Sequence, residues 1–283
     1  FGPVDGNLDH DPDAGFIPSY ISFVSLRNAV VEATFVPPHD DTRPWSSGFL
    51  FRQEGPTEEH IIAISNNGYW YHNLREGTTA SETVAFGYSP DIATSQGKTN
   101  HIRVIALEDV GWLFINGNYI AELDLSGGSE AGDVSILGSW FRDEQFAGET
   151  TGFEGFTVRS LQTIYGPEEG AIEDEPGGEV DTHNSTAWLA DAVVEARFHN
   201  PYSITEGEWS PGFLLRNSEY NALHFIGITS DGYWYHYVGT GTMESRKQMQ
   251  YTFSKHIATS PSGSNSLRVI ALGDEGWLFI NGA

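Results

Sequence analysis

The chain of 283 residues contains no cysteine. This absence excludes disulfide bonds, catalysis by a thiolate and metal sites with cysteine ligands, although it does not fix the cellular compartment. No apolar stretch approaches the roughly 20 residues that a transmembrane helix needs, so membrane insertion is not expected. No stretch shows a sustained helical period with capping residues, so the structure is expected to consist of strands.

Basic residues are scarce. The chain has 14 Lys and Arg against 39 Asp and Glu, which gives a formal net charge of −25. Such a surface repels phosphate groups and no basic stripe interrupts it, so the sequence predicts no nucleic acid partner. The charge fits a protein kept in solution by its surface, and it also makes divalent cations plausible counterions. Because the chain starts at Phe1, a removed signal peptide is a hypothesis, and we expect the protein outside the cell or at its surface.

Long segments of the sequence occur twice. The offset between the copies runs from 163 residues (29 to 192) to 165 residues (111 to 276). This repetition predicts two tandem copies of one domain, residues 1–164 and 165–283, the second without an equivalent of residues 119–164. The repeated segments are AVVEATF and AVVEARF at 29–35 and 192–198, GFLFR and GFLLR at 48–52 and 212–216, GYWYH at 68–72 and 232–236, RVIAL at 103–107 and 268–272, and GWLFING at 111–117 and 276–282.

Three explanations of the incomplete second copy remain open. The chain is a piece of a longer protein, or a neighbouring chain supplies the missing strands, or the second domain has a rearranged end. Donor-strand complementation is the known precedent for the second explanation, because an open sheet edge can be filled by a strand in trans.

The local patterns are those of strands and tight turns. The run VVEATF alternates apolar and polar residues, as a half-buried strand does, and Asn116-Gly117 between two apolar runs is a strong hairpin signal. Many such strands joined by Gly, Asn and Pro predict an all-β fold. We expect tandem antiparallel two-sheet β-sandwiches of the jelly-roll type, the second incomplete.

The order GFLFR, IAISNNGYWYH, HIRVIAL, GWLFINGNYIAELDL and FEGFTVRS resembles the concanavalin A-like lectin/glucanase superfamily. Within it, the chain looks most like laminin G-like and 3-keto-disaccharide hydrolase-type modules of bacterial exported proteins. The resemblance covers nearly all of the first copy and about two-thirds of the second. It implies a sandwich fold, a function with carbohydrates, and in some laminin G-like domains a Ca²⁺ ion at the rim.

The resemblance also allows a test for catalysis. Retaining glucanases of the superfamily carry their two carboxylates in a Glu-x-Asp-x-x-Glu strand motif. Here Glu122 and Asp124 are followed by Gly127 in place of the second Glu, so no enzyme is expected. The histidines that recur in both copies are expected to have structural roles: His60 and His224, and His72 and His236.

Two arginines recur at the end of equivalent strands. Arg52 and Arg216 could each bind a carboxylate or sugar hydroxyls through the planar guanidinium group. The competing interpretation, which we favour, is an internal ion pair with Glu32 and Glu195, respectively.

A possible Ca²⁺ site lies near the N-terminus. Asp9, Asp11 and Asp13 occupy alternate positions before Gly15, a spacing that can place several oxygen atoms around one ion. A solvated acidic turn is the simpler interpretation.

Aromatic residues are the best candidates for ligand binding, because exposed rings stack on sugars and anchor interfaces. In a strand, Trp70 points away from Tyr71, so one set of rings enters the core and the other faces outward. The candidates are Trp45, Trp70 and Tyr71 in the first copy and Trp209, Trp234 and Tyr235 in the second.

The sequence therefore predicts a non-catalytic extracellular binding or adhesion module that recognises a glycan or another surface polymer. The first alternative is a structural subunit of an extracellular filament or surface layer, in which copies of the chain are the partners and the second domain is completed by a neighbour. The second alternative is a carbohydrate-active hydrolase.

Overall fold

The computed structural model describes residues 1–10, 19–38, 44–55, 57–77, 80–95, 97–138, 149–172, 185, 187, 189, 191–215, 223–239 and 245–283. The chain divides into two compact units, Phe1–Thr163 and Ile164–Ala283, which are described separately. The predicted all-β antiparallel fold is confirmed, because every strand pair in the described part is antiparallel. No helix in that part is long and apolar enough to cross a bilayer.

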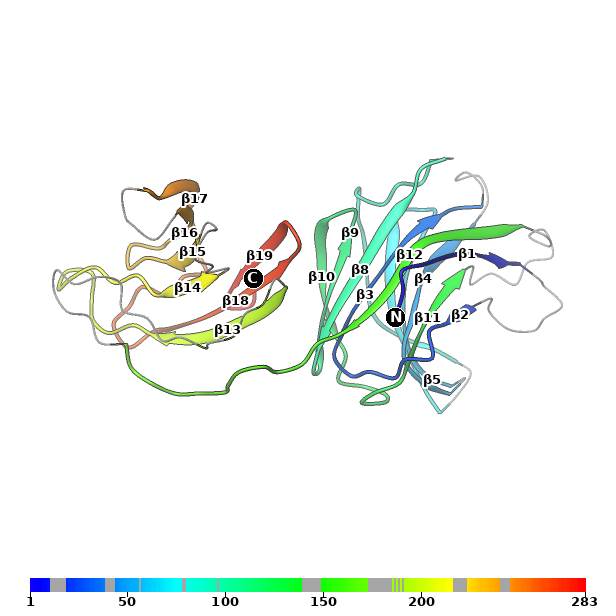
Figure 1. The fold of residues 1–283 in the computed structure, drawn as a ribbon, viewed down its shortest axis with the longest axis horizontal. Coiled ribbons are helices and arrows are strands. Elements are labelled where there is room, and N and C mark those ends of the chain that lie inside the picture. Colours follow the sequence, from blue (N-terminus) through cyan, green and yellow to red (C-terminus); the bar gives the residue numbers. More distant parts are fainter. Residues whose placement is uncertain are drawn as a thin grey trace. The chain divides into compact units, whose positions relative to one another are not determined.

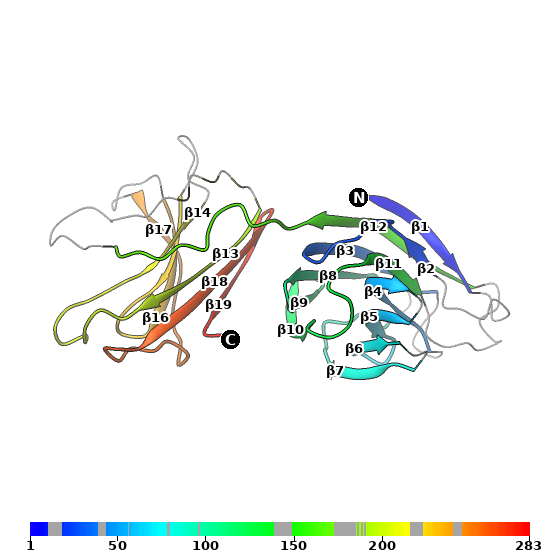
Figure 2. The same ribbon diagram turned by 90° about the horizontal axis from the view of Figure 1, so that it is seen from below.

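Unit 1 consists of two six-stranded sheets that face each other as layers (Figures 1 and 2). Sheet A has, in spatial order, β1 (Val4–Asp9), β12 (Thr150–Ser160), β3 (Ala29–Val36), β8 (Asn100–Leu107), β9 (Val110–Ile115) and β10 (Asn118–Asp124). Sheet B has β2 (Ser19–Ile21), β11 (Asp133–Gly138), β4 (Ser46–Gly55), β5 (Glu58–Ser65), β6 (Tyr69–Glu76) and β7 (Glu82–Tyr88). Central strands therefore pair with segments far apart in the sequence.

The core lies between the two sheets. Residues alternate along each strand, so that Val31 and Phe35 of β3 face inward while Glu32 between them faces outward. From sheet B, Phe49 meets Phe35 edge to face with ring centroids 5.6 Å apart. Phe156 of β12 stacks on Phe49 at 6.3 Å. Rings from three different strands thus join the layers.

The predicted hairpin at Asn116-Gly117 joins β9 to β10. Both residues have positive φ, 53° and 83°, as a two-residue turn that matches the strand twist requires. Asn116 adds a side-chain bond, because its Oδ1 accepts from the backbone N–H of His101 at 2.8 Å.

Unit 2 contains a three-stranded sheet C and a four-stranded sheet D. Sheet C has the order β13 (Ala192–His199), β18 (Ser264–Leu272) and β19 (Glu275–Ile280). Sheet D has the order β14 (Gly212–Leu215), β15 (Leu223–Ile228), β16 (Tyr233–Gly239) and β17 (Lys247–Phe253). Its core includes Trp209, Ile228 and Leu267.

Candidate functional site

We call the face of sheet B that points away from the core the outer face. Its base is a small apolar cluster separate from the main core, made by Leu50, Ile61, Ala63 and Leu137. Leu50 lies directly opposite Ile61 across β4 and β5, so the pairing register fixes which neighbours share this face.

A hydrogen-bonded polar group lies beside this base. Glu59 accepts a bond at 2.7 Å from Arg75 Nη1 and one at 2.8 Å from Gln53 Nε2. Ser135 Oγ donates to Gln53 Oε1 at 3.1 Å. The Glu59 side chain is only 1% exposed, and this burial raises its pKa, against the opposing effect of Arg75. The three hydrogen bonds hold Arg75, Glu59, Gln53 and Ser135 in a fixed geometry.

Asn73 lies between Tyr71 and Arg75 on the outer face of β6, directly opposite Ile61. Its Oδ1 is buried and accepts no hydrogen bond in the described part of the chain. A buried acceptor without a donor costs on the order of 1–3 kcal/mol, so a rotation of the partly exposed Asn73 side chain that brings Oδ1 to a ligand hydroxyl removes this cost.

Aromatic rings continue the outer face across β6 and β7. Tyr71 lies opposite Phe86 and Tyr69 lies opposite Tyr88. Phe86 and Tyr88 are 63% and 65% exposed, and the Tyr69 and Tyr88 rings lie 5.7 Å apart, edge to face. Exposed rings of this kind bind the apolar faces of a ligand.

The tryptophans predicted to bind a ligand lie in the cores instead. Trp45 and Trp70 belong to the main core of unit 1, and a Cβ at Gly87 would come within 2.8 Å of Trp70 Nε1. Trp209 is buried in the core of unit 2, and its Nε1 donates to Tyr202 O at 3.1 Å. Trp234 is half-buried against the same core. Burial leaves Trp45, Trp70 and Trp209 without an open ring face.

Tyr71 and Tyr235, in contrast, lie on outer faces. Tyr71 is opposite Ala63, and Tyr235 is opposite Gly227 at the equivalent place in unit 2. Tyr235 Oη accepts a bond from Ser210 Oγ at 3.0 Å. The expected alternation between Trp70 and Tyr71 is therefore seen, and ligand binding by the two tyrosines stays a prediction.

The prediction of an ion pair between Arg52 and Glu32 is wrong. Arg52 is 1% exposed and donates to the carbonyl oxygens of Leu125 at 2.8 Å and of Arg27 at 3.1 Å, and also to that of Glu108. Its φ of +54° at an irregularity of β4 turns the side chain inward. Arg52 is thus unavailable to a ligand.

Glu32 and Glu195 have other partners. Glu32 is bound by Arg103 at 2.8 Å and by Arg159 at 2.7 Å, and Glu195 by Arg268 at 2.8 Å. Arg216 lies outside the described residues, so its predicted role stays untested.

The recurring histidines form a pair in each unit, buried in unit 1 and half-buried in unit 2. His60 Nδ1 and His72 Nε2 are 3.0 Å apart, and His224 Nδ1 and His236 Nε2 are also 3.0 Å apart. His60 Nε2 donates to Gly127 O at 2.9 Å, so in the neutral pair Nδ1 of His60 accepts from His72. Burial lowers the pKa of His60 to about 4 and that of His72 to about 3.

The predicted Ca²⁺ site is only partly described. Asp9 is exposed at the end of β1, and Asp11 and Asp13 lie outside the described residues. Within the described ranges, no group of three or more His, Cys, Asp or Glu residues is placed to hold a metal ion. Ca²⁺ binding at Asp9, Asp11 and Asp13 stays a prediction.

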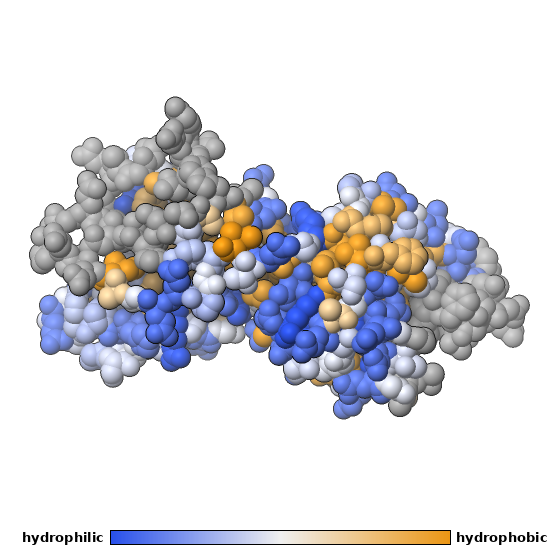
Figure 3. Space-filling view, turned by 60° about the horizontal axis from the view of Figure 1, so that its bottom comes forward, coloured by the Kyte–Doolittle hydropathy of each residue, from blue (hydrophilic) through white to orange (hydrophobic). Residues whose placement is uncertain are grey.

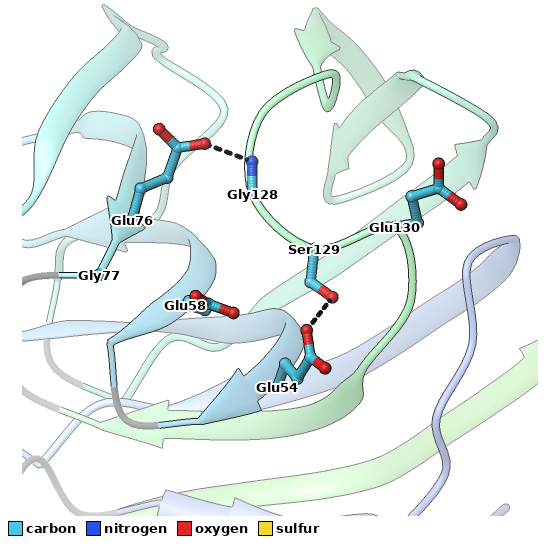
Figure 4. A pocket seen from close by; sticks show the side chains of 7 residues that line it. All are labelled: Glu54, Glu58, Glu76, Gly77, Gly128, Ser129 and Glu130. Carbon is cyan, nitrogen blue, oxygen red and sulfur yellow. Dashed lines mark hydrogen bonds between the residues drawn. The ribbon is translucent and has the colours of Figure 1, made fainter.

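An acidic pocket of about 510 Å³ opens at the ends of β4, β5 and β6 (Figure 4). Its carboxylates are those of Glu54, Glu58, Glu76 and Glu130. Glu58 and Glu76 lie directly opposite each other on β5 and β6, a like-charge pair that costs stability. Backbone N–H of Gly128 donates to Glu76 at 2.7 Å, and Ser129 Oγ donates to Glu54 at 2.8 Å.

The pocket is not built from the glucanase-like segment. Glu122 and Asp124 lie on β10 of sheet A, where Asp124 binds Ser126. Neither carboxylate lines the pocket.

Six residues of the outer face of sheet B were not predicted from the sequence. A period of two in YWYHNLR marks Asn73 and Arg75 as neighbours of Tyr69 and Tyr71 on one face, and the same period in VAFGY marks Phe86 and Tyr88. No local signal points to Gln53 and Glu59, because their contact with Arg75 depends on the register of three strands.

Unit 2 has a different outer face. Leu223 and Gly239 stand where unit 1 has Glu59 and Arg75, and Tyr237 stands where it has Asn73. Tyr233 stacks on Tyr251 with centroids 4.8 Å apart, and Tyr235 lies 5.3 Å from Tyr237. The described part of unit 2 thus retains the aromatic part of the surface, while Leu223 and Gly239 cannot form the ion pair of Glu59 and Arg75.

Comparison with known proteins gives fold likenesses only. No family model and no curated protein matches the chain. A carbohydrate-binding module, CBM66 from Bacillus subtilis, is similar over 56% of this chain and 85% of its own, with 16% identity and a TM-score of 0.41. Sheep galectin-11 is similar over 51% and 97%, with 11% identity and a TM-score of 0.38. A Bacillus licheniformis β-glucanase is similar over 51% and 71%, with 11% identity and a TM-score of 0.39. These values are too low to transfer a function.

Proposed function

We propose that the outer face of sheet B in unit 1 binds a glycan, and that the chain is a non-catalytic binding module outside the cell or at its surface. One observation carries the proposal: a fixed polar group and an unpaired Asn73 Oδ1 adjoin exposed aromatic rings on a single sheet face. A sugar offers hydroxyl groups along its edge and C–H groups on its ring faces, which need these two kinds of partner.

The net charge of the chain limits which classes of glycan can bind to the outer face. A net charge of −25 repels acidic polysaccharides, and the ion pair of Glu59 with Arg75 adds no net charge to the outer face. Asn73 and Arg75 are partly exposed and offer amide and guanidinium groups to the hydroxyls of a neutral sugar, while the buried Glu59 holds Arg75 in place. The ligand is therefore a neutral glycan.

Removing the exposed rings is expected to abolish most of the binding. The double variant Phe86→Ala, Tyr88→Ala should bind at least tenfold more weakly, because the lost ring contacts are worth roughly 1.4 kcal/mol or more. The measurement is affinity electrophoresis in gels that contain a soluble neutral polysaccharide, taken in turn from glucans, mannans and fructans. Both side chains are exposed, so the fold should not change.

Tyr119→Ala is the matched control, because Tyr119 is also an exposed ring but lies on β10 of sheet A. Its mobility in the gels should equal that of the wild type. Absence of retardation by every neutral polysaccharide, or an equal loss in Tyr119→Ala, would refute the proposed face.

Hydrolysis of a polysaccharide is the second candidate function, favoured by the carboxylates of the acidic pocket. A glycosidase needs two carboxyl groups on either side of the scissile bond, and Glu58 and Glu76 are opposite each other. The binding proposal expects no release of reducing ends from the polysaccharide that is bound. Release that disappears in Glu58→Gln and in Glu76→Gln would establish hydrolysis instead.

A further inference from the structure

The two units differ at one edge of equivalent strands. In sheet A, β3 lies between β12 and β8. In the described part of unit 2, β13 pairs with β18, and no strand is described on its other edge. Residues 29–33 and 192–196 have the same sequence, AVVEA, so β13 presents the backbone and side chains that hold β12 in unit 1. An unpaired edge of this kind is a template for a further strand.

Among the described residues of unit 2, none covers the inward side chains of β13 as β12 covers those of β3 in unit 1. Val31 and Phe35 are fully buried, whereas their counterparts Val194 and Phe198 are only half-buried. The ring pair between the sheets is retained, since Phe198 and Phe213 lie 5.8 Å apart, as Phe35 and Phe49 do at 5.6 Å. What unit 2 lacks, in its described part, is the third ring, which Phe156 of β12 supplies in unit 1.

The charges at the same edge show a matching difference. In unit 1, Glu32 is bound by Arg103 of β8 and by Arg159 of β12, and its side chain is 16% exposed. In unit 2, Glu195 is bound by Arg268 of β18 and is 55% exposed. Within the described residues, no second basic side chain is bound to Glu195 where Arg159 binds Glu32, which leaves room for one there.

We infer that the open edge of β13 binds an extended peptide segment of the β12 type. The peptide is antiparallel to β13, with apolar residues at the positions of Phe153, Phe156 and Val158 and a basic residue at the position of Arg159. Main-chain hydrogen bonds hold it, and the pockets for alternate side chains select it. This site is separate from the proposed glycan-binding face and does not rest on it.

The pairing in unit 1 fixes the expected register. Phe153 lies opposite Phe35, Glu154 opposite Thr34 and Val158 opposite Val31. In unit 2 these places belong to Phe198, Arg197 and Val194, so Glu154 of the peptide meets a basic side chain. The charge pattern thus favours the same register as the apolar pattern.

A labelled synthetic peptide with the sequence of residues 150–160, TTGFEGFTVRS, tests the inference with the full chain. Fluorescence anisotropy should show saturable binding. Hydrogen exchange should slow at the amides of β13 and stay unchanged at β3, whose edge is already occupied by β12. A peptide with Phe156→Asp should bind at least tenfold more weakly, because a charge enters the apolar layer.

A charge reversal distinguishes specific binding of the peptide at the edge of β13 from nonspecific binding to the surface. The chain variant Glu195→Arg should bind the native peptide several-fold more weakly and should regain affinity for the peptide with Arg159→Glu. Absence of saturable binding, or slowed exchange away from β13, would overturn the inference. If β13 is already protected in the chain alone and that protection rises with protein concentration, a second copy occupies the edge and the peptide partner is wrong.

Discussion

Acidification from pH 7 to pH 4.5 is expected to destabilise unit 1 by about 2–3 kcal/mol for each histidine of the buried pair His60–His72. Both rings lie between the sheets and are at most 1% exposed. Burial lowers the pKa of His60 to about 4, with a further contribution from Arg52, and lowers the pKa of His72 to about 3, with a further contribution from His60. The pair is therefore neutral at pH 7.

The direction in which stability changes with pH follows from the number of protons bound by the folded and the unfolded chain. An unfolded histidine has a pKa near 6.5, so below that pH the unfolded chain binds protons that the folded pair does not accept. The stability contributed by the pair is complete above pH 6.5 and is lost as the pH falls toward 4. Interactions with His101 and Arg103 lower the pKa of Glu32 to about 2, so that carboxyl adds its own loss only below about pH 4.5. The loss of stability from pH 6.5 to 4.5 therefore comes from the histidines, since the raised pKa of Glu59 acts in the opposite direction.

Urea unfolding followed by tryptophan fluorescence at several pH values measures this loss. In the double variant His60→Leu, His72→Leu the pH dependence of unit 1 should largely disappear, whereas His256→Gln, which removes an exposed histidine of unit 2, should keep it. Burial also lowers the pKa of His236, so unit 2 should weaken over the same interval. A wild-type free energy of unfolding that stays constant from pH 6.5 to 4.5 would contradict the buried neutral pair.

Much of the fold follows from short-range patterns in the sequence. The alternation in GYWYH puts Trp70 and Tyr71 on opposite faces of their strand, as is observed, and the positive φ values of Asn116 and Gly117 match the predicted hairpin. These features depend on neighbouring residues, whose geometry is fixed by the strand period and by turn chemistry. Local sequence therefore suffices for strand faces and tight turns.

The candidate site depends on contacts that no local pattern encodes. Glu59 meets Arg75 only because β5 and β6 pair in one register, and Ser135 reaches Gln53 across 82 residues of sequence. The pairing of β11 with β4, two strands far apart in the sequence, cannot be read from periodicity. The strand period separates the two sets of aromatic rings, but which set faces the core depends on where the partner sheet lies.

At Arg52, one backbone torsion breaks the alternation of side-chain direction along the strand. After Phe51, which faces the core, the alternation predicts an outward side chain, but the φ of +54° turns Arg52 inward as well. There it donates to three carbonyl oxygens from three different connections, those of Arg27, Glu108 and Leu125. A single planar group with several donors in fixed directions is suited to this bridging.

Replacing Arg52 is expected to cause a large loss of stability in unit 1. Arg52→Met keeps the length of the side chain but leaves buried carbonyl oxygens without donors, at a cost of about 3–5 kcal/mol in the free energy of unfolding. Arg52→Lys should lose about half as much, because an ammonium group reaches fewer of the carbonyl groups. Urea unfolding at pH 7 measures both variants.

Arg159→Ala provides the control, because Arg159 forms an ion pair on the surface with Glu32, and its loss should cost no more than about 1 kcal/mol. Arg52 also precedes Gln53 and Glu54, which belong to the polar group and to the acidic pocket. The fraction of the Arg52→Lys variant that remains folded should therefore bind the neutral glycan more weakly than the wild type does, although Arg52 touches no ligand. Equal stability of Arg52→Met and Arg159→Ala would show that the three carbonyl groups find other donors and that Arg52 does not hold the end of β4 in place.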